Sequence, residues 1–287
     1  MKQYLFILYT AMLLSGCSAN EPTHTTEAPE AISFNIKHPS AAVTRATETD
    51  FEPGDCVGVF LTISGQPIAM AGNEATNMPL TYNGDTWTAD HTLYWNDSQY
   101  DAYAYYPFTT PLASTTDMPF SVQTDQSTAE GYTASDFLWA QRKAVTAADG
   151  TIDLTFAHCM SRLMIRLVKG DSYEGELPEE AEVYIHNTFT DATIDLHAGV
   201  VTRNPHASRH TIHARKVGNH RYCALVIPQR LDNRMPLVEV VSHGVSFLYE
   251  SKFLFKPGIQ HNVLLTLSNN PEQIKIEIGG EKENWND

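Results

Sequence analysis

The chain of 287 residues is poor in basic side chains, with 19 Lys and Arg against 34 Asp and Glu, and its formal net charge is −15. An acidic surface repels the phosphates of DNA and RNA, so we expect no nucleic-acid partner. The sequence also lacks the G-x-S-x-G, H-E-x-x-H and P-loop patterns. Because these patterns carry much of hydrolytic and phosphate chemistry, we expect a protein that is not an enzyme and that uses no cofactor and no metal.

Cysteine is scarce, and the four cysteines are far apart with no C-x-x-C pair. This spacing gives no support to a zinc site or a thioredoxin-like redox pair. Cys56 and Cys223 fall in apolar runs typical of strands, where a cysteine behaves as a small hydrophobic residue. Together with Cys159, they are predicted to be three buried free thiols.

No apolar run reaches the roughly 20 residues that a membrane-spanning helix needs. An uncharged run over residues 4–14 follows Lys2 and ends in Leu14-Ser15-Gly16-Cys17. This is the pattern of a cleaved lipoprotein signal, and it matches more closely than an ordinary secretory signal with an incidental cysteine. We expect removal of residues 1–16 and attachment of lipid to Cys17.

Sustained helical periodicity is missing, and alternation of apolar and polar residues dominates. Ile32, Phe34 and Ile36 alternate with polar residues, which predicts a strand with one buried face. Asn83-Gly84 and Asp149-Gly150 each separate two strand-like runs and predict hairpin turns. Many short strands at this spacing indicate an all-β protein built from antiparallel β-sandwiches.

The domain organisation follows from composition. Residues 17–30 are rich in Thr, Pro, Glu and Ala and are expected to form a flexible tether. The acidic stretch 171–180 contains glycine and proline and is the best candidate for a linker. We therefore place one sandwich at 31–170 and a second at 181–287.

Five short patterns occur in one order along the chain. They are Pro53-Gly54-Asp55 before Val57-Gly58-Val59-Phe60, Tyr103-Ala104-Tyr105-Tyr106-Pro107, Asp136-Phe137-Leu138-Trp139-Ala140, Phe156-Ala157-His158 with Met160-Ser161-Arg162-Leu163, and Lys256-Pro257-Gly258 before Val263-Leu264-Leu265-Thr266-Leu267. With the pattern that ends at Cys17, they make nearly the whole chain resemble the fimbrillin family, the lipoprotein pilins of type V fimbriae. Each pattern alone is weak, and their common order makes the resemblance specific.

The resemblance implies two tandem transthyretin-like β-sandwich domains and a surface-exposed location, first on the outer membrane and then in the fimbrium. It implies that an Arg-specific protease removes the N-terminal strand and that a strand from a neighbouring subunit, self or paralogous, fills the groove. A strand from another chain can restore both the hydrogen-bond ladder and the packing of an opened sandwich. The implied role is assembly of fimbriae and adhesion.

The sequence contains candidates for each part of this route. The removable strand is 31–37, with Ile32, Phe34 and Ile36 facing inward. Cleavage between Arg45 and Ala46 would discard this strand together with the lipid. The donor strand is 272–278, whose Ile274, Ile276 and Ile278 repeat the same spacing.

Other interpretations remain open for these segments. Residues 31–37 also fit a permanent strand, 272–278 also fits the last strand of its own domain, and Arg45 also fits a linker residue. In that case the protein would keep its lipid. It would then act as an anchor, a tip component or a free-standing surface lipoprotein that recognises a glycan or a host protein.

Four further groups fit structural roles better than binding of a sugar or a metal. The aromatic stretch 94–108 could stack on sugars, but aromatics in strands more often form the core. The histidines at 206, 210, 213 and 220 lie among arginines without an acidic ligand, which favours a solvated basic loop over a metal site. His158 is expected to satisfy a backbone group at a strand end. Trp285 is expected to fill a pocket on this chain or on a neighbour.

Overall fold

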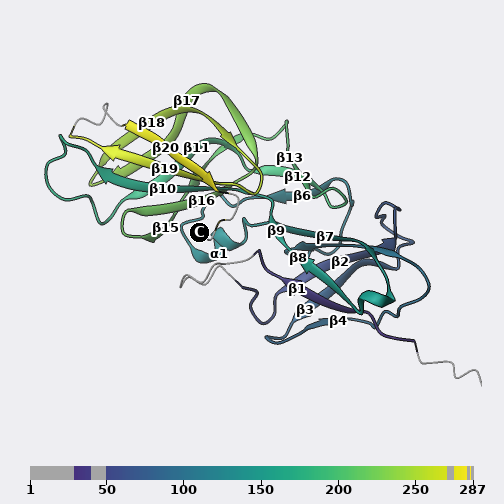
Figure 1. Ribbon diagram of the computed structural model, residues 1–287. Coiled ribbons are helices and arrows are strands. Elements are labelled where there is room, and N and C mark those ends of the chain that lie inside the picture. The colour runs from purple at the N-terminus through teal and green to yellow at the C-terminus, as the bar shows by residue number, and fades with distance from the viewer. Residues whose placement is uncertain (1–28, 40–49, 270–274, 283–284, 286–287) are drawn as a thin grey trace, which may run out of the picture.

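The computed structural model describes residues 29–39, 50–269, 275–282 and Trp285, and over these residues the protein is all-β. Only two short helical segments are present in this part of the chain, α1 (Ala129–Thr133) and the 3-10 turn η1 (Ala147–Asp149). The strands form two lobes, seen at the lower right and the upper left of Figure 1. The all-β prediction is thus confirmed.

The first lobe contains a six-stranded sheet and a two-stranded sheet. The larger has the order β4 (Trp87–Ala89), β3 (Ala75–Tyr82), β2 (Cys56–Ile63), β5 (Tyr100–Tyr106), β7 (Leu138–Val145) and β9 (Ala157–His158). The smaller pairs β1 (Ser33–Lys37) with β8 (Thr151–Thr155). β3 and β4 form the hairpin expected at Asn83-Gly84. The turn at Asp149-Gly150 instead carries the chain from one sheet to the other, so the hairpin predicted there is wrong.

The second lobe contains a five-stranded and a four-stranded sheet. The first has the order β15 (Arg215–Gly218), β16 (Arg221–Val226), β10 (Ser161–Lys169), β19 (Gln260–Leu267) and β20 (Lys275–Lys282). The second has the order β14 (Arg209–His213), β11 (Glu182–Phe189), β17 (Gln229–Ser242) and β18 (Val245–Phe255). A three-stranded sheet joins the lobes, with the order β13 (Val200–Arg203), β12 (Asp191–Asp195) and β6 (Met118–Ser121).

The position of β10 differs from the expected division at 171–180. β10 pairs with β16 and β19, so it lies in the second lobe although we placed it in the first sandwich. The stretch 171–180 connects β10 to β11 within that lobe. A long surface loop and a linker need the same polar, glycine-rich composition, and composition therefore does not distinguish them.

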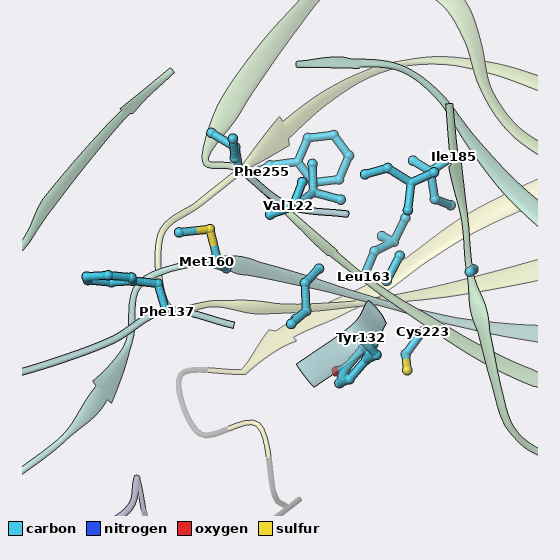
Figure 2. Close-up of a cluster of buried hydrophobic side chains, with 14 of the residues drawn as sticks. Val122, Tyr132, Phe137, Met160, Leu163, Ile185, Cys223 and Phe255 are labelled. Atoms are coloured by element: carbon cyan, nitrogen blue, oxygen red, sulfur yellow. The ribbon is translucent and has the colours of Figure 1, made fainter. Parts of the chain in front are cut away.

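Both faces of the six-stranded sheet are covered. Successive side chains on a strand point to opposite faces, and Val57, Val59 and Leu61 of β2 pack in one core cluster together with β1 and β8. Phe60 of β2 packs in a second cluster that extends through the second lobe. Figure 2 shows part of this second cluster, which includes Phe137, Met160 and Phe255. The lobes are therefore joined by a continuous core.

A glycine makes possible one close contact between the first lobe and the three-stranded sheet that joins the lobes. Trp139 of β7 donates its indole N–H to the carbonyl of Leu196 at 2.7 Å. Gly199, in the turn between β12 and β13, has φ +67°, and a Cβ at this position would lie 2.5 Å from the Trp139 ring.

We expect Gly199→Ala to lower the free energy of unfolding by about 2–4 kcal/mol. Alanine is strained in the left-handed backbone conformation, and its methyl group would overpack against Trp139. Gly244→Ala is the matched control, because Gly244 has φ +76° but no atom within 4 Å of the added Cβ. The control should lose only the backbone contribution of about 1–2 kcal/mol. Urea unfolding of both variants measures the difference, and equal losses would show that the contact with Trp139 does not matter.

Candidate functional site at β1, β20 and Trp285

β1 is held by a parallel ladder to β8, in which Phe34 lies opposite Ile152 and Ile36 opposite Leu154. The ladder ends where the Phe156 amide donates to the carbonyl of Lys37 at 2.9 Å. On the other side, only the start of the segment is bonded. The Ile32 amide donates to the carbonyl of Leu93 and the Trp95 amide donates to the carbonyl of Glu30, both at 2.8 Å. β1 therefore has one full ladder partner among the described strands.

The inward face of β1 covers an apolar floor. Ile32 and Ile36 are buried and Phe34 is partly buried in the core of the first lobe. Beside them in the ladder, Ile152 and Leu154 of β8 are fully buried. All of these side chains pack in one cluster with Val57, Val59 and Leu61 of the six-stranded sheet, which forms the floor. Each such side chain contributes about 1.5–3 kcal/mol when it is removed from water, so departure of β1 would expose a groove that is unstable in water.

β20 lies at the edge of the five-stranded sheet and pairs antiparallel with β19. Ile276 packs partly against the main core, whereas the side chain of Ile278 is 54% exposed. Because apolar burial sets most of the stability of such a strand, β20 gains less from its present position than its isoleucines could gain in a covered groove.

Trp285 is the buried anchor beyond β20. Its ring is 6% exposed and stacks on His158, with ring centroids 3.7 Å apart and planes 8° from parallel. The indole N–H donates to the carbonyl of Gly258 at 2.9 Å, and a guanidinium nitrogen of Arg162 donates to the carbonyl of Trp285 at 3.3 Å. The sequence predicted that Trp285 fills a pocket on this chain or on a neighbour, and in the structure it fills a site on its own chain.

A small hollow of about 150 Å³ adjoins Trp285. Its lining includes His38, Phe51, Tyr106, Asp136, His158 and Trp285. Asp136 accepts a hydrogen bond from Nδ1 of His158 at 2.9 Å, so the predicted role of His158 in satisfying a backbone group is wrong. Burial, followed by the charge of His158, lowers the pKa of His38, and the neutral ring of His38 is favoured.

Several predicted residues lie outside the described residues. They are Cys17, Arg45, Ala46 and Ile274. In the described part of the chain, no helix is long and apolar enough to cross a membrane.

The remaining candidate groups have structural roles. Cys56, Cys159 and Cys223 are free, and burial raises the pKa of Cys159 to about 12, but Cys56 is only half-buried, contrary to expectation. Tyr100, Tyr103 and Tyr105 of the aromatic stretch are fully buried and present no face to a sugar, whereas Tyr94 at its start is exposed. His210 and His213 lie in β14 and not in a loop. Across the described residues, no group of three metal-ligating side chains is found.

The family model described as "Fimbrillin-like" matches residues 44–285 of this chain. The chain belongs to the fimbrillin-like family. The resemblance drawn from the five short patterns is thereby confirmed. The matched range includes β20 and Trp285 but begins after β1.

Relatives of this fimbrillin-like chain include fimbrial and adhesion proteins of Bacteroides. A protein of Bacteroides ovatus named "Putative fimbrium tip subunit Fim1C" is 28% identical over 199 residues, which are 58% of this chain but 36% of that protein. The match therefore spans about a third of that relative. A "putative cell adhesion protein" from Bacteroides uniformis matches with a TM-score of 0.68 and 19% identity, covering 91% of this chain and 99% of its own. Another from Bacteroides ovatus has a TM-score of 0.66 and 16% identity, covering 89% and 97%. At these identities, the two structures show the shared fold.

Sequence reasoning did not link Trp285 to the residues that surround it. His38, Asp136 and Arg162 are separated from Trp285 by more than a hundred residues, and no local pattern links them. The Phe-Ala-His pattern at 156–158 contains His158 but does not indicate that it pairs with Asp136 or stacks on Trp285.

Proposed function

We propose that this fimbrillin-like chain is a structural subunit of cell-surface fimbriae, which assembles by exchanging β1 for a strand of a neighbouring subunit and acts in adhesion. Before assembly it is an outer-membrane lipoprotein anchored through lipid at Cys17. Its two lobes correspond to the tandem transthyretin-like sandwiches of the family. Cleavage after Arg45 releases β1 and the lipid together, and the assembled chain begins at Ala46.

The observation that carries this proposal is the position of β1 over an apolar floor, with one full ladder partner. Such a strand can leave without breaking the six-stranded sheet, and the exposed floor then favours any strand with the same inward pattern. β20 carries that pattern. If it enters parallel to β8, as β1 does, Ile274, Ile276 and Ile278 replace Ile32, Phe34 and Ile36.

Treatment of the soluble, unlipidated chain with an Arg-specific protease tests the proposal. We expect a product that begins at Ala46 and has lost the β1 peptide. In size-exclusion chromatography, the monomers should convert to a series of oligomers of increasing size. Mass spectrometry identifies the new first residue and the released peptide.

Two variants serve as controls. Arg45→Gln should keep β1 and remain monomeric under the same treatment. The variant that combines Ile276→Asp with Ile278→Asp should be cleaved normally but form no oligomers, because a donor strand with two inward carboxylates does not fit an apolar groove. A chain that begins at Ala46, retains no β1 and stays monomeric without aggregating would contradict strand exchange.

A second candidate role is that of a tip component or surface binder that recognises a glycan or a host protein, and the similarity to the fimbrium tip subunit favours it. The first residue of the protein recovered from cell surfaces distinguishes the two roles. Ala46 indicates a cleaved and assembled subunit, whereas lipidated Cys17 indicates an anchored protein.

A further inference from the structure

His158 contacts residues from both segments that take part in the proposed exchange. One face of its ring is covered by Trp285. His38 meets it edge-on, with ring centroids 5.9 Å apart and planes at 77°. The hydrogen bond to Asp136 fixes the orientation of the ring, and the side chain is 10% exposed. The backbone of His158 pairs with Leu138 in the six-stranded sheet, and its ring contacts both Trp285 and His38.

His38 belongs to the segment that β1 carries. It follows Lys37 directly, and its ring also packs edge-on against Phe51, with centroids 5.1 Å apart. β8, the ladder partner of β1, leads through Phe156 into His158 within three residues. Departure of β1 would thus remove an aromatic neighbour of His158 and also the support of the strand that leads to it.

Trp285 in turn holds β20. The backbone of β20 pairs with β19, and Ile276 is partly buried. Its other side-chain contacts are weak, because Ile278 and the ion pair between Lys256 and Glu281 are exposed. Trp285 lies three residues after β20. Its buried ring, which is stacked on His158 and hydrogen-bonded to Gly258, holds the chain after β20 in place. Loss of order at His158 would therefore loosen the segment that the proposed exchange needs as a donor.

We propose that His158 couples the two segments, so that departure of β1 and His38 weakens the docking of Trp285 and frees β20. This inference rests on the proposed function, in which β1 leaves and β20 is donated. The coupling is reciprocal by thermodynamic linkage, and loosening Trp285 weakens the hold on β1 by the same factor. An uncleaved subunit would keep its donor strand docked, which prevents premature assembly.

Hydrogen exchange on the full, uncleaved, monomeric chain tests the coupling without any need for polymerisation. We expect His38→Ala to raise the exchange of the β20 amides roughly twofold to tenfold, the range that an edge-on aromatic contact supports. Trp285→Ala should raise the exchange of the amides of β1 and β8. His38→Phe keeps a ring at this position and should restore slow exchange in β20.

His206→Ala is the matched control, since His206 is an exposed histidine between β13 and β14 and belongs to neither segment. Neither this variant nor the β18 amides in any variant should change. If Trp285→Ala speeds exchange in β20 while His38→Ala does not, the coupling is refuted. That result would leave strand exchange itself standing, because protease treatment tests it separately.

Discussion

Ile36→Asp is expected to detach β1 and to turn the monomer into oligomers without any protease. Ile36 is buried in the core of the first lobe opposite Leu154. The substitution removes about 1.5–3 kcal/mol of apolar burial and puts a carboxylate into a site with no partner, which costs several kcal/mol more. Since β1 has one full ladder partner, the strand should leave while the six-stranded sheet stays folded. Light scattering would then detect species above the monomer mass.

The neighbouring position Ser33 provides the control for this prediction. Ser33 is in the same strand but exposed, and its hydroxyl bonds to that of Thr151, which can donate equally to a carboxylate. Ser33→Asp should therefore leave the protein monomeric and within about 0.5 kcal/mol of its original stability. Adding Ile278→Asp to the Ile36→Asp chain should reduce the oligomers, because the donor then lacks an inward isoleucine. Ile36→Asp protein that stays monomeric at full stability would show that β1 is not the strand covering the groove.

Asp101→Ala is expected to lower the free energy of unfolding by about 3 kcal/mol or more. The carboxylate is almost fully buried and accepts four hydrogen bonds. Its donors are the Ser64 hydroxyl at 2.9 Å, the Gly65 amide at 3.1 Å, the Ala144 amide at 2.9 Å and the Lys143 ammonium at 3.3 Å. Truncation leaves the amides of Gly65, in the turn after β2, and of Ala144, in β7, without this acceptor. Urea unfolding at neutral pH measures the loss.

The pH dependence of this variant has a definite sign. Burial by itself raises the pKa of Asp101, but the hydrogen bonds from Ala144, Gly65, Ser64 and Lys143 outweigh it and hold the pKa below the ordinary value of 3.8. The unfolded chain therefore binds the proton more tightly than the folded chain, and Asp101 stabilises the fold above pH 3.8. This contribution is lost as the pH falls through the folded pKa, so Asp101→Ala should flatten the acid limb of the stability profile.

Asp97→Ala is the control for both measurements, because Asp97 is an exposed carboxylate four residues away. It should leave the stability and its acid limb within about 0.5 kcal/mol of the unsubstituted chain. An Asp101→Ala variant with the same profile as Asp97→Ala would mean that the four hydrogen bonds contribute nothing net.

Sequence alone determined the class of the fold and the family. Alternation with a period of two is a local property of a strand, and it suffices to place Ile32, Phe34 and Ile36 on one inward face. The turn residues Asn83-Gly84, also a local signal, identified the hairpin between β3 and β4. The order of five short patterns, none specific alone, was enough to indicate a fimbrillin.

Only the tertiary structure decided which strands share a sheet and what holds Trp285. β10 joins β16 and β19 in the second lobe because its apolar face is buried there, and burial of that face depends on strands that follow it in the chain. The contact of His158 with His38 and Trp285 joins residues more than a hundred positions apart. Such contacts depend on which surfaces remain to be covered after the sheets have formed, and this long-range choice leaves no periodic trace in the sequence.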